Sequence, residues 1–450
     1  MELTFGTDGV RGAANIELTA EYALAFGRAL ARVLAPGEVV IGRDTRESGP
    51  MLEGAVSAGL SAEGVDVRLL GVCPTPAVAR ACTGERTAGL MISASHNPFS
   101  DNGLKVFAPG GLKLSDQQES GFDPVLRQLL ESGPAVSEGR VGRITGDQTA
   151  LGRYADAVIA SIEGRDLAGL HLVADCANGA ASQVAPAVLR RLGARVTVLA
   201  DRPDGRNINA GCGSTHLEVL QQAVVGEGAA LGLAFDGDAD RLLAVDHRGR
   251  VIDGDQLIAI SALDRHRRGC LAADTVVVTV MTNLGFRIGM RGHGIEVRET
   301  AVGDRYVLEA LEAGGFVLGG EQSGHLIFRD LATTGDGLLS AVQILDLVRR
   351  SGSTLADLAD EAMTRLPQVL RNVRVSGPAS AVVQAMAGQI EAVSARLGDG
   401  GRVLVRPSGT EPLVRIMAEA AEATAAEAAV SELVAAAEAA AAARTGTGAA

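Results

Sequence analysis

Apolar residues recur along the chain in a unit of a short strand, a polar loop, an amphipathic helix, a glycine and a second strand. The unit occurs three times, with its two strands at 39–41 and 64–70, at 170–174 and 193–199, and at 276–279 and 294–298. Strands that alternate with helices are typical of parallel sheets. The long repeat period indicates duplicated domains and excludes a solenoid. Three similar α/β domains are therefore predicted.

Changes in this pattern predict domains over residues 1–150, 151–252, 253–366 and 367–450. After Pro367 a strand, a helix over 380–397, two more strands and an Ala-rich helix predict a smaller α+β domain. Ligands bind at the carboxyl ends of the strands in open α/β sheets, so the polar loops of the three α/β domains should face one cleft. The predicted fold has three similar α/β domains with mixed, largely parallel sheets around a central cleft, plus the C-terminal α+β domain.

Composition narrows the class of protein without identifying it. The 450 residues are 47% hydrophobic and 21% charged, as in ordinary globular proteins. A net charge of −13 argues against non-specific binding to nucleic acid or to an anionic membrane. The five cysteines are scattered, and neither a signal peptide nor a membrane-spanning apolar run is evident. A cytoplasmic protein without nucleic-acid or membrane partners is expected.

The segment 91–98 reads as the end of a buried strand followed by a tight turn of small and hydroxyl residues. Ser95, His96 and Lys105 lie close together in sequence and could form a nucleophile with proton-transfer partners. Only Lys105 and Lys113 are lysines, although arginine is abundant; an ammonium can lose its proton and a guanidinium effectively cannot. The alternative is a hydroxyl-stabilised turn with exposed His and Lys side chains.

A second loop, Asp236-Gly-Asp238-Ala-Asp240-Arg241, also follows an apolar run. Alternate carboxylates in a tight loop can converge on one hard cation and leave positions free for phosphate or water, which suits Mg²⁺. An EF-hand is excluded because its sixth and twelfth positions hold Arg241 and His247. A solvated acidic turn and an aspartyl nucleophile of the haloacid dehalogenase type are the alternatives.

A third polar stretch, 319–325, contains Glu321, Ser323 and His325. The first two could hydrogen-bond sugar hydroxyls and His325 could move a proton, whereas the alternative is a plain polar hairpin loop.

Two further stretches each combine glycine with an arginine. In 406–412, the backbone N–H groups and Arg406 suit a phosphate dianion. The stretch 6–12 carries Arg11, with a flexible linker as its alternative reading.

Five motifs occur in an order that resembles the α-D-phosphohexomutase superfamily along nearly the whole chain. They are GTDGVRG at 6–12, SASHNP at 93–98 with DNGLK at 101–105, DGDADR at 236–241, GEQSGH at 320–325 and RPSGTEP at 406–412. Three finer features resemble the phosphoglucosamine mutase branch: the segment 92–98, the segment 207–216 and Gln322.

The resemblance implies a role for each motif. Ser95 is expected to be a phosphoserine, and its phosphate together with Asp236, Asp238 and Asp240 is expected to hold Mg²⁺. Proton transfer is expected from Lys105, with Arg11, His96 and His325 as further catalytic candidates. The expected substrate-binding residues are Arg241, Glu321, Ser323, Arg406, Ser408, Gly409, Thr410 and Arg415.

The resemblance further implies an isomerase that converts glucosamine 6-phosphate to the 1-phosphate through a 1,6-bisphosphate. It would supply UDP-N-acetylglucosamine and cell-wall precursors. A hexose 1,6-bisphosphate is expected as activator, a phosphosugar as ligand, a homodimer as assembly, and a hinge near Leu366-Pro367 that closes the fourth domain. The rival functions are a phosphomannomutase/phosphoglucomutase and a non-enzymatic phosphosugar sensor, although a sensor would not need a nucleophile.

Overall fold

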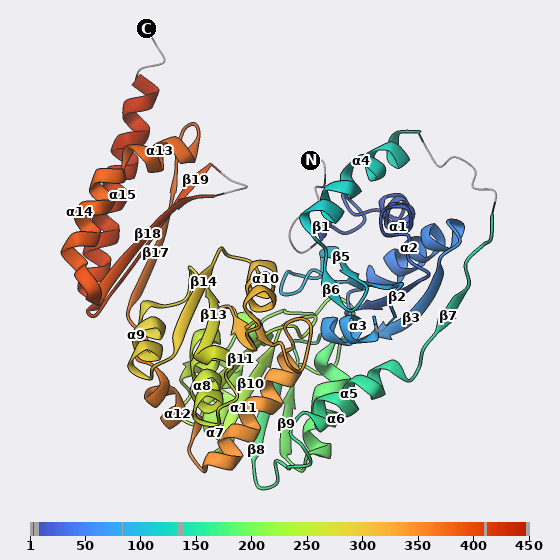
Figure 1. Ribbon diagram of the computed structural model, residues 1–450, viewed down its shortest axis with the longest axis horizontal. Coiled ribbons are helices and arrows are strands. Elements are labelled where there is room, and N and C mark those ends of the chain that lie inside the picture. The colour runs from blue at the N-terminus through green and yellow to red at the C-terminus, as the bar shows by residue number, and fades with distance from the viewer. Residues whose placement is uncertain (1–2, 4–8, 83, 133–138, 409–411, 447–450) are drawn as a thin grey trace. The chain divides into compact units, whose positions relative to one another are not determined.

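The computed structural model describes residue 3 and residues 9–82, 84–132, 139–408 and 412–446 (Figure 1). The chain divides into two compact units. The first contains residues 1–281 and 293–362, and the second contains residues 282–292 and 363–450. Each unit is considered by itself. Among the described residues, no helix is long and apolar enough to cross a membrane.

The first sheet of unit 1 has seven strands, and helices pack against it. Its elements are β1 (Val10–Ala13), α1 (Ala20–Leu34), β2 (Glu38–Arg43), α2 (Gly49–Ala62), β3 (Asp66–Val72), α3 (Thr75–Ala81), β4 (Thr87–Ile92), β5 (Asp101–Ala108), β6 (Leu112–Lys113), α4 (Asp116–Ser132) and β7 (Ile144–Gly146). The strand order is β1-β5-β4-β2-β3-β7, with β6 paired to β5. The central pairs β4–β2 and β2–β3 are parallel, whereas β5 runs antiparallel to both β1 and β4.

Helices α1 and α2 pack together over this sheet and share its hydrophobic core with α4. The hydroxyl of Thr19 accepts a hydrogen bond from Tyr22 N and caps α1. Gly27 and Gly59 allow the two helices to approach closely, because a Cβ on either residue would lie within 2.4 Å of a carbonyl oxygen of the other helix.

The second sheet has the strand order β12-β11-β10-β8-β9. Its elements are α5 (Ala150–Ala160), β8 (His171–Asp175), α6 (Ala181–Arg191), β9 (Arg195–Leu199), the short turn η1 (Gly213–Thr215), α7 (Glu218–Glu227), β10 (Leu231–Phe235), β11 (Leu242–Asp246) and β12 (Val251–Ile252). Strands β10, β8 and β9 are parallel and β11 is antiparallel to β10.

The third sheet repeats this core with the order β14-β13-β15-β16. Its elements in unit 1 are α8 (Gly254–Arg267), the short turn η2 (Ala272–Asp274), β13 (Thr275–Thr279), β14 (Glu296–Thr300), α10 (Asp304–Gly314), β15 (Leu318–Gly320), β16 (Leu326–Phe328), α11 (Gly337–Ser351) and α12 (Leu355–Ala362). In all three sheets the first strand of the repeat lies between the second and the third, and an antiparallel fourth strand pairs with the third. The predicted fold of three similar, mixed and largely parallel sheets is therefore confirmed.

Unit 2 contains an antiparallel sheet of order β17-β19-β18 with helices packed against it. Its elements are α9 (Leu284–Gly292), β17 (Gln368–Arg374), α13 (Ala379–Ala385), α14 (Ala387–Leu397), the short turn η3 (Gly398–Gly400), β18 (Gly401–Pro407), β19 (Leu413–Ala420) and α15 (Ala423–Gly446). Buried Glu419 accepts hydrogen bonds from Leu284 N at 2.8 Å and from Arg402 Nε at 2.6 Å, so it ties α9 to the sheet. The smaller α+β domain is confirmed.

The prediction of a single helix over residues 380–397 is wrong in one respect. The structure has two helices, α13 and α14, that meet at Met386. Met386 has φ −91° and ψ 1°, outside the helical region, and its side chain is fully buried in the core of unit 2. Burial of this side chain at the junction accompanies the break, which apolar periodicity alone does not reveal.

Candidate active site

Ser95 lies in the serine loop (Ser93–Asp101), which joins β4 to β5. The side chain is buried, and Oγ donates a hydrogen bond to Asp236 Oδ2 at 2.6 Å. Ser95 adopts a left-handed conformation with φ 52°, unusual for a residue with a side chain. Its backbone N donates to Ser93 Oγ, and Ser93 Oγ in turn donates to buried Asp44 at 2.7 Å. The turn thus delivers the hydroxyl to a carboxylate of the second sheet.

Three carboxylates converge in the aspartate loop (Asp236–Arg241), which joins β10 to β11. One oxygen from each of Asp236, Asp238 and Asp240 lies within 4.8 Å of the other two, and all three residues are buried. Within the described part of the chain, the Oδ1 atoms of Asp238 and Asp240 are buried without a hydrogen-bond partner. Buried carboxylate oxygens that lack donors are strongly disfavoured unless a cation compensates them. The donor set fits a hard divalent cation.

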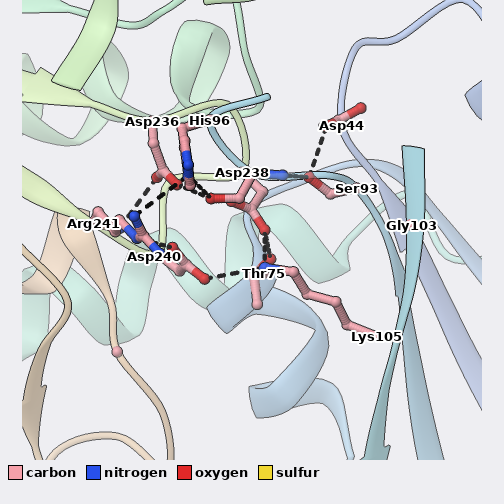
Figure 2. Close-up of polar contacts among 12 residues, drawn as sticks. Asp44, Thr75, Ser93, His96, Gly103, Lys105, Asp236, Asp238, Asp240 and Arg241 are labelled. Carbon is pink, nitrogen blue, oxygen red and sulfur yellow. Dashed lines mark hydrogen bonds and ion pairs between the residues drawn. The ribbon is translucent and has the colours of Figure 1, made fainter. Parts of the chain in front are cut away.

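Lys105 provides a buried positive charge beside the aspartates (Figure 2). It lies on β5 in register with Met91 of β4, and Nζ donates to Asp238 Oδ2 at 2.8 Å and to Asp240 Oδ2 at 3.3 Å. At the start of α3, Thr75 Oγ1 donates to the same oxygen of Asp238 at 2.6 Å. The first and second sheets are therefore linked at this point by hydrogen-bonded charges.

The aspartates differ in their electrostatic surroundings. Burial raises the pKa of Asp236 well above its usual value, and the charges of Asp240 and Asp238 add to this effect. Burial also acts on Asp240, but Lys105 and His325 outweigh it and hold the pKa of Asp240 well below its usual value. A proton in the metal-free cluster therefore resides more readily on Asp236, beside Ser95.

His96 and Arg241 lie near Asp236, on the other side of the cluster from Lys105 (Figure 2). His96 Nδ1 is 3.4 Å from Ser95 Oγ and 3.3 Å from Arg241 Nη1. Burial, Arg241 and Arg11 lower the pKa of His96 to about 4. His96 is therefore a neutral imidazole near neutral pH and can accept a proton. Arg11 is placed on β1, in register with Gly103 of β5.

The loop between β15 and β16 contains the third group of predicted residues. Glu321 Oε1 accepts a hydrogen bond from Gly303 N at 3.0 Å, and no residue that the structure describes forms a hydrogen bond with buried Ser323 Oγ. His325 Nδ1 lies 3.8 Å from Asp240 Oδ1. Burial would lower the pKa of His325, but Asp240 outweighs this effect and the pKa is raised. The structure thus brings His325 to the same cluster as Lys105.

The remaining predicted residues lie in unit 2. Arg406 on β18 pairs directly with Arg415 on β19, and burial together with the charge of Arg415 lowers the pKa of Arg406. Like charges placed opposite each other destabilise a sheet, which favours an anion as their partner. Arg415 Nε and Ser408 Oγ are buried and have no hydrogen-bond partner among the described residues. Gly409 and Thr410 lie outside the described residues.

Sequence reasoning missed Asp44, Arg46, Thr75 and Asn209, which all contact the serine loop or the aspartates. The polar loop after the first strand of each repeat was visible, but nothing in the pattern indicated that Arg46 reaches the serine loop. Only the position of these residues in the sequence could have indicated their role, because loops at the carboxyl ends of neighbouring parallel strands meet at one edge of the sheet.

Family models cover nearly the whole chain. Those of the phosphoglucomutase/phosphomannomutase family match residues 2–124 (alpha/beta/alpha domain I), 152–249 (domain II), 253–366 (domain III) and 370–437 (C-terminal domain).

Individual relatives match over similar lengths. The chain is 55% identical to the phosphoglucosamine mutase of Frankia alni over 435 residues, which cover 93% of this chain and 94% of the relative. It is 53% identical to that of Pelotomaculum thermopropionicum over 428 residues, which cover 93% and 95%. A solved phosphoglucomutase/phosphomannomutase family protein from Burkholderia thailandensis has a TM-score of 0.82 at 25% identity, covering 98% of each chain.

Proposed function

Because the chain belongs to the phosphoglucomutase/phosphomannomutase family, we propose that it is an isomerase with phosphoglucosamine mutase activity. It converts D-glucosamine 6-phosphate reversibly to α-D-glucosamine 1-phosphate. The observation that carries the proposal is the buried Ser95 hydroxyl, held 2.6 Å from a carboxylate of a triad that can bind a metal. The identity to curated phosphoglucosamine mutases favours an amino sugar over mannose or glucose phosphates.

Ser95 is the proposed phosphate carrier. In the first transfer the bond between Ser95 Oγ and phosphorus breaks, and a bond from phosphorus to O1 of glucosamine 6-phosphate forms. In the second transfer the bond between O6 and phosphorus breaks, and Ser95 is phosphorylated again. The serine ends each cycle as it began, so no phosphate is consumed. An unphosphorylated chain would need a hexose 1,6-bisphosphate to start the cycle.

The aspartate loop is the proposed magnesium site. Asp236, Asp238 and Asp240 would hold the ion, with the phosphate of Ser95 as a further ligand. When bound, Mg²⁺ would stabilise negative charge on the phosphoryl oxygens during transfer. The two aspartate oxygens without hydrogen-bond partners support this assignment.

Proton transfer is assigned to groups that already contact the cluster. A sugar hydroxyl that attacks phosphorus loses a proton, and Ser95 Oγ gains one when its phosphate leaves. Lys105 is the proposed relay, with His96 and His325 as further carriers and Arg11 as an electrostatic neighbour. His96 is neutral near pH 7 because its pKa is about 4, and an imidazole of such low basicity can hold an accepted proton only transiently.

The sugar and its unreactive phosphate are assigned to separate groups. Glu321 and Ser323 are proposed to bind hydroxyls, and Arg241 to bind the reacting end. Arg406, Arg415 and the Ser408–Thr410 segment are proposed to bind the unreactive phosphate, in agreement with the cross-strand arginine pair. Either phosphate can occupy this place, so each orientation of the intermediate can be held.

The proposal also covers the oligomeric state of the protein and its location in the cell. The family resemblance suggests a homodimer, which sedimentation would test. Five free thiols fit the reducing cytoplasm.

The test is turnover of glucosamine 6-phosphate with Mg²⁺ and a trace of glucose 1,6-bisphosphate, comparing the wild type with Ser95→Ala. Glucose and mannose phosphates are assayed in parallel. We expect preferential turnover of the amino sugar and none in the alanine variant. Preference for mannose or glucose phosphate would reject glucosamine 6-phosphate as the substrate. Activity of the Ser95→Ala variant would reject the proposed phosphoserine mechanism.

A further inference from the structure

Arg46 lies in the loop after β2 and is fully buried, although arginine is rarely buried without a partner. Its guanidinium has five N–H donors in a fixed plane, and all five are used. Nε donates to Asp44 Oδ2 at 2.8 Å. Nη2 donates to Ser95 O and Asn97 O, both at 2.9 Å, and Nη1 donates to Asp101 O at 3.0 Å and to Pro98 O.

Four of these acceptors are carbonyls of the serine loop, so one side chain holds the loop at four points. The other contact is to Asp44, whose Oδ2 also accepts from Ser93 Oγ. Ser93 Oγ in turn accepts from Ser95 N. Both backbone polar groups of Ser95 therefore connect to the same buried ion pair.

A second side chain reaches the same carbonyls from the second sheet. Asn209 Nδ2 donates to Ser95 O at 2.9 Å and to Asn97 O at 3.0 Å. Asn209 itself adopts φ 58°, and it lies in the loop between β9 and α7. The carbonyl of Ser95 is thus fixed from two domains, on the same residue whose hydroxyl meets Asp236.

We propose that Arg46 and Asn209 are positioning residues for phosphoryl transfer, which hold Ser95 in its left-handed conformation with Oγ directed at the aspartates. This inference rests on the proposed function. A strained backbone persists only where its surroundings determine it, and this hydrogen-bonded network is what surrounds Ser95. Neither side chain is assigned to the substrate, so their contribution should appear in the chemical step and not in binding.

Lysine cannot replace Arg46, because an ammonium offers three donors from one point and cannot span four carbonyls and a carboxylate. We expect Arg46→Lys to lower kcat by about 100-fold, the loss associated with a misplacement of about 1 Å, while KM changes less than about threefold. The matched control is Arg43→Lys, since Arg43 ends the preceding strand β2 and, among the described residues, its guanidinium pairs with Glu53 at 3.4 Å. This control should keep wild-type kcat. Circular dichroism melting would compare the folds.

Asn209→Gly tests the inference independently and guards against misfolding of the Arg46 variant. Glycine accepts the positive φ and removes the side chain with its amide donor, so we expect kcat to fall about tenfold with KM unchanged. The control is Asn15→Gly, at an exposed residue with φ 59°. Wild-type kcat in the folded Arg46→Lys or in the Asn209→Gly variant would overturn the inference. A rise in KM at constant kcat would overturn it equally.

The rate of Ser95 phosphorylation by glucose 1,6-bisphosphate, followed by intact mass, separates the two proposals. A wild type that accepts phosphate on Ser95 but does not isomerise glucosamine 6-phosphate would reject the substrate. Slower phosphorylation of Arg46→Lys and Asn209→Gly than of their controls would still support the positioning role, and equal rates would reject it.

Discussion

Gly237, between the first two aspartates, should be intolerant of any side chain. A Cβ added there would lie 2.5 Å from Ser95 O, 2.9 Å from Ile208 Cδ1 and 3.0 Å from Asn209 Nδ2. No left-handed φ is recorded for Gly237, so the effect of Gly237→Ala is one of space and not of backbone strain. The nearest obstacle is backbone, which cannot rotate away as a side chain could.

The size of the effect follows from these distances. Ordinary Cβ contacts begin at 3.4 Å, so the serine loop and the aspartate loop must separate by about 1 Å. That displacement acts directly on the 2.6 Å contact between Ser95 Oγ and Asp236 Oδ2. A misplacement of about 1 Å costs on the order of 100-fold in rate, and overpacking a dense interior costs about 1–3 kcal/mol.

The assay is steady-state isomerisation of glucosamine 6-phosphate together with a thermal melt. The control is Gly226→Ala in α7, where an added Cβ meets nothing within 4 Å. Because Gly226 is exposed in a helix, alanine there should raise stability by about 0.5–1 kcal/mol and leave kcat unchanged. A Gly237→Ala protein with a kcat within threefold of the wild type would refute the argument that close approach of the two loops positions Ser95.

Two further predictions concern buried charge. Burial raises the pKa of Asp336 to about 6, and its carboxylate accepts from Tyr154 Oη at 2.7 Å. Between about pH 4 and pH 6 the folded state then binds more protons than the unfolded state, so the free energy of unfolding falls by about 3 kcal/mol as pH rises. Asp336→Asn should remove this pH dependence. Curves of melting temperature against pH that run parallel for the variant and the wild type would contradict the prediction. Lys105→Met leaves Asp238 and Asp240 without their buried cation, so in EDTA we expect a loss of about 3–5 kcal/mol that added Mg²⁺ largely restores. Equal melting temperatures of variant and wild type in EDTA would show that Lys105 does not compensate the aspartates.

Much of the fold was predictable because its signals are local. Buried parallel strands read as short apolar runs, and β2, β8 and β13 lie where the runs indicated, within one or two residues. The start of α1 carries a local signal as well, since Thr19 precedes an amphipathic stretch. The break at Met386 was not predictable, because a buried junction between two helices shows the same apolar periodicity as one helix.

The candidate site likewise contains some residues that the sequence indicates and others that it does not. Ser95 and the aspartates were visible because small, hydroxyl and acidic residues follow apolar strands abruptly. Arg46 and Asn209 were not, because their contacts span 49 and 114 positions of sequence. Their side chains also carry no pattern of their own: an arginine and an asparagine in polar loops are ordinary surface residues until the fold buries them.

The repeated topology explains why one domain alone would not form this site. In each sheet the loop of interest joins the third strand to its antiparallel fourth, so the three loops occupy equivalent positions. The first such loop carries Ser95, the second the three carboxylates and the third His325. Their joining contacts all cross between sheets, from Ser95 to Asp236, from Lys105 to Asp238 and from His325 to Asp240. Duplication of one fold thus supplied three loops at equivalent edges, and divergence of their residues could then assign each a different part of one reaction.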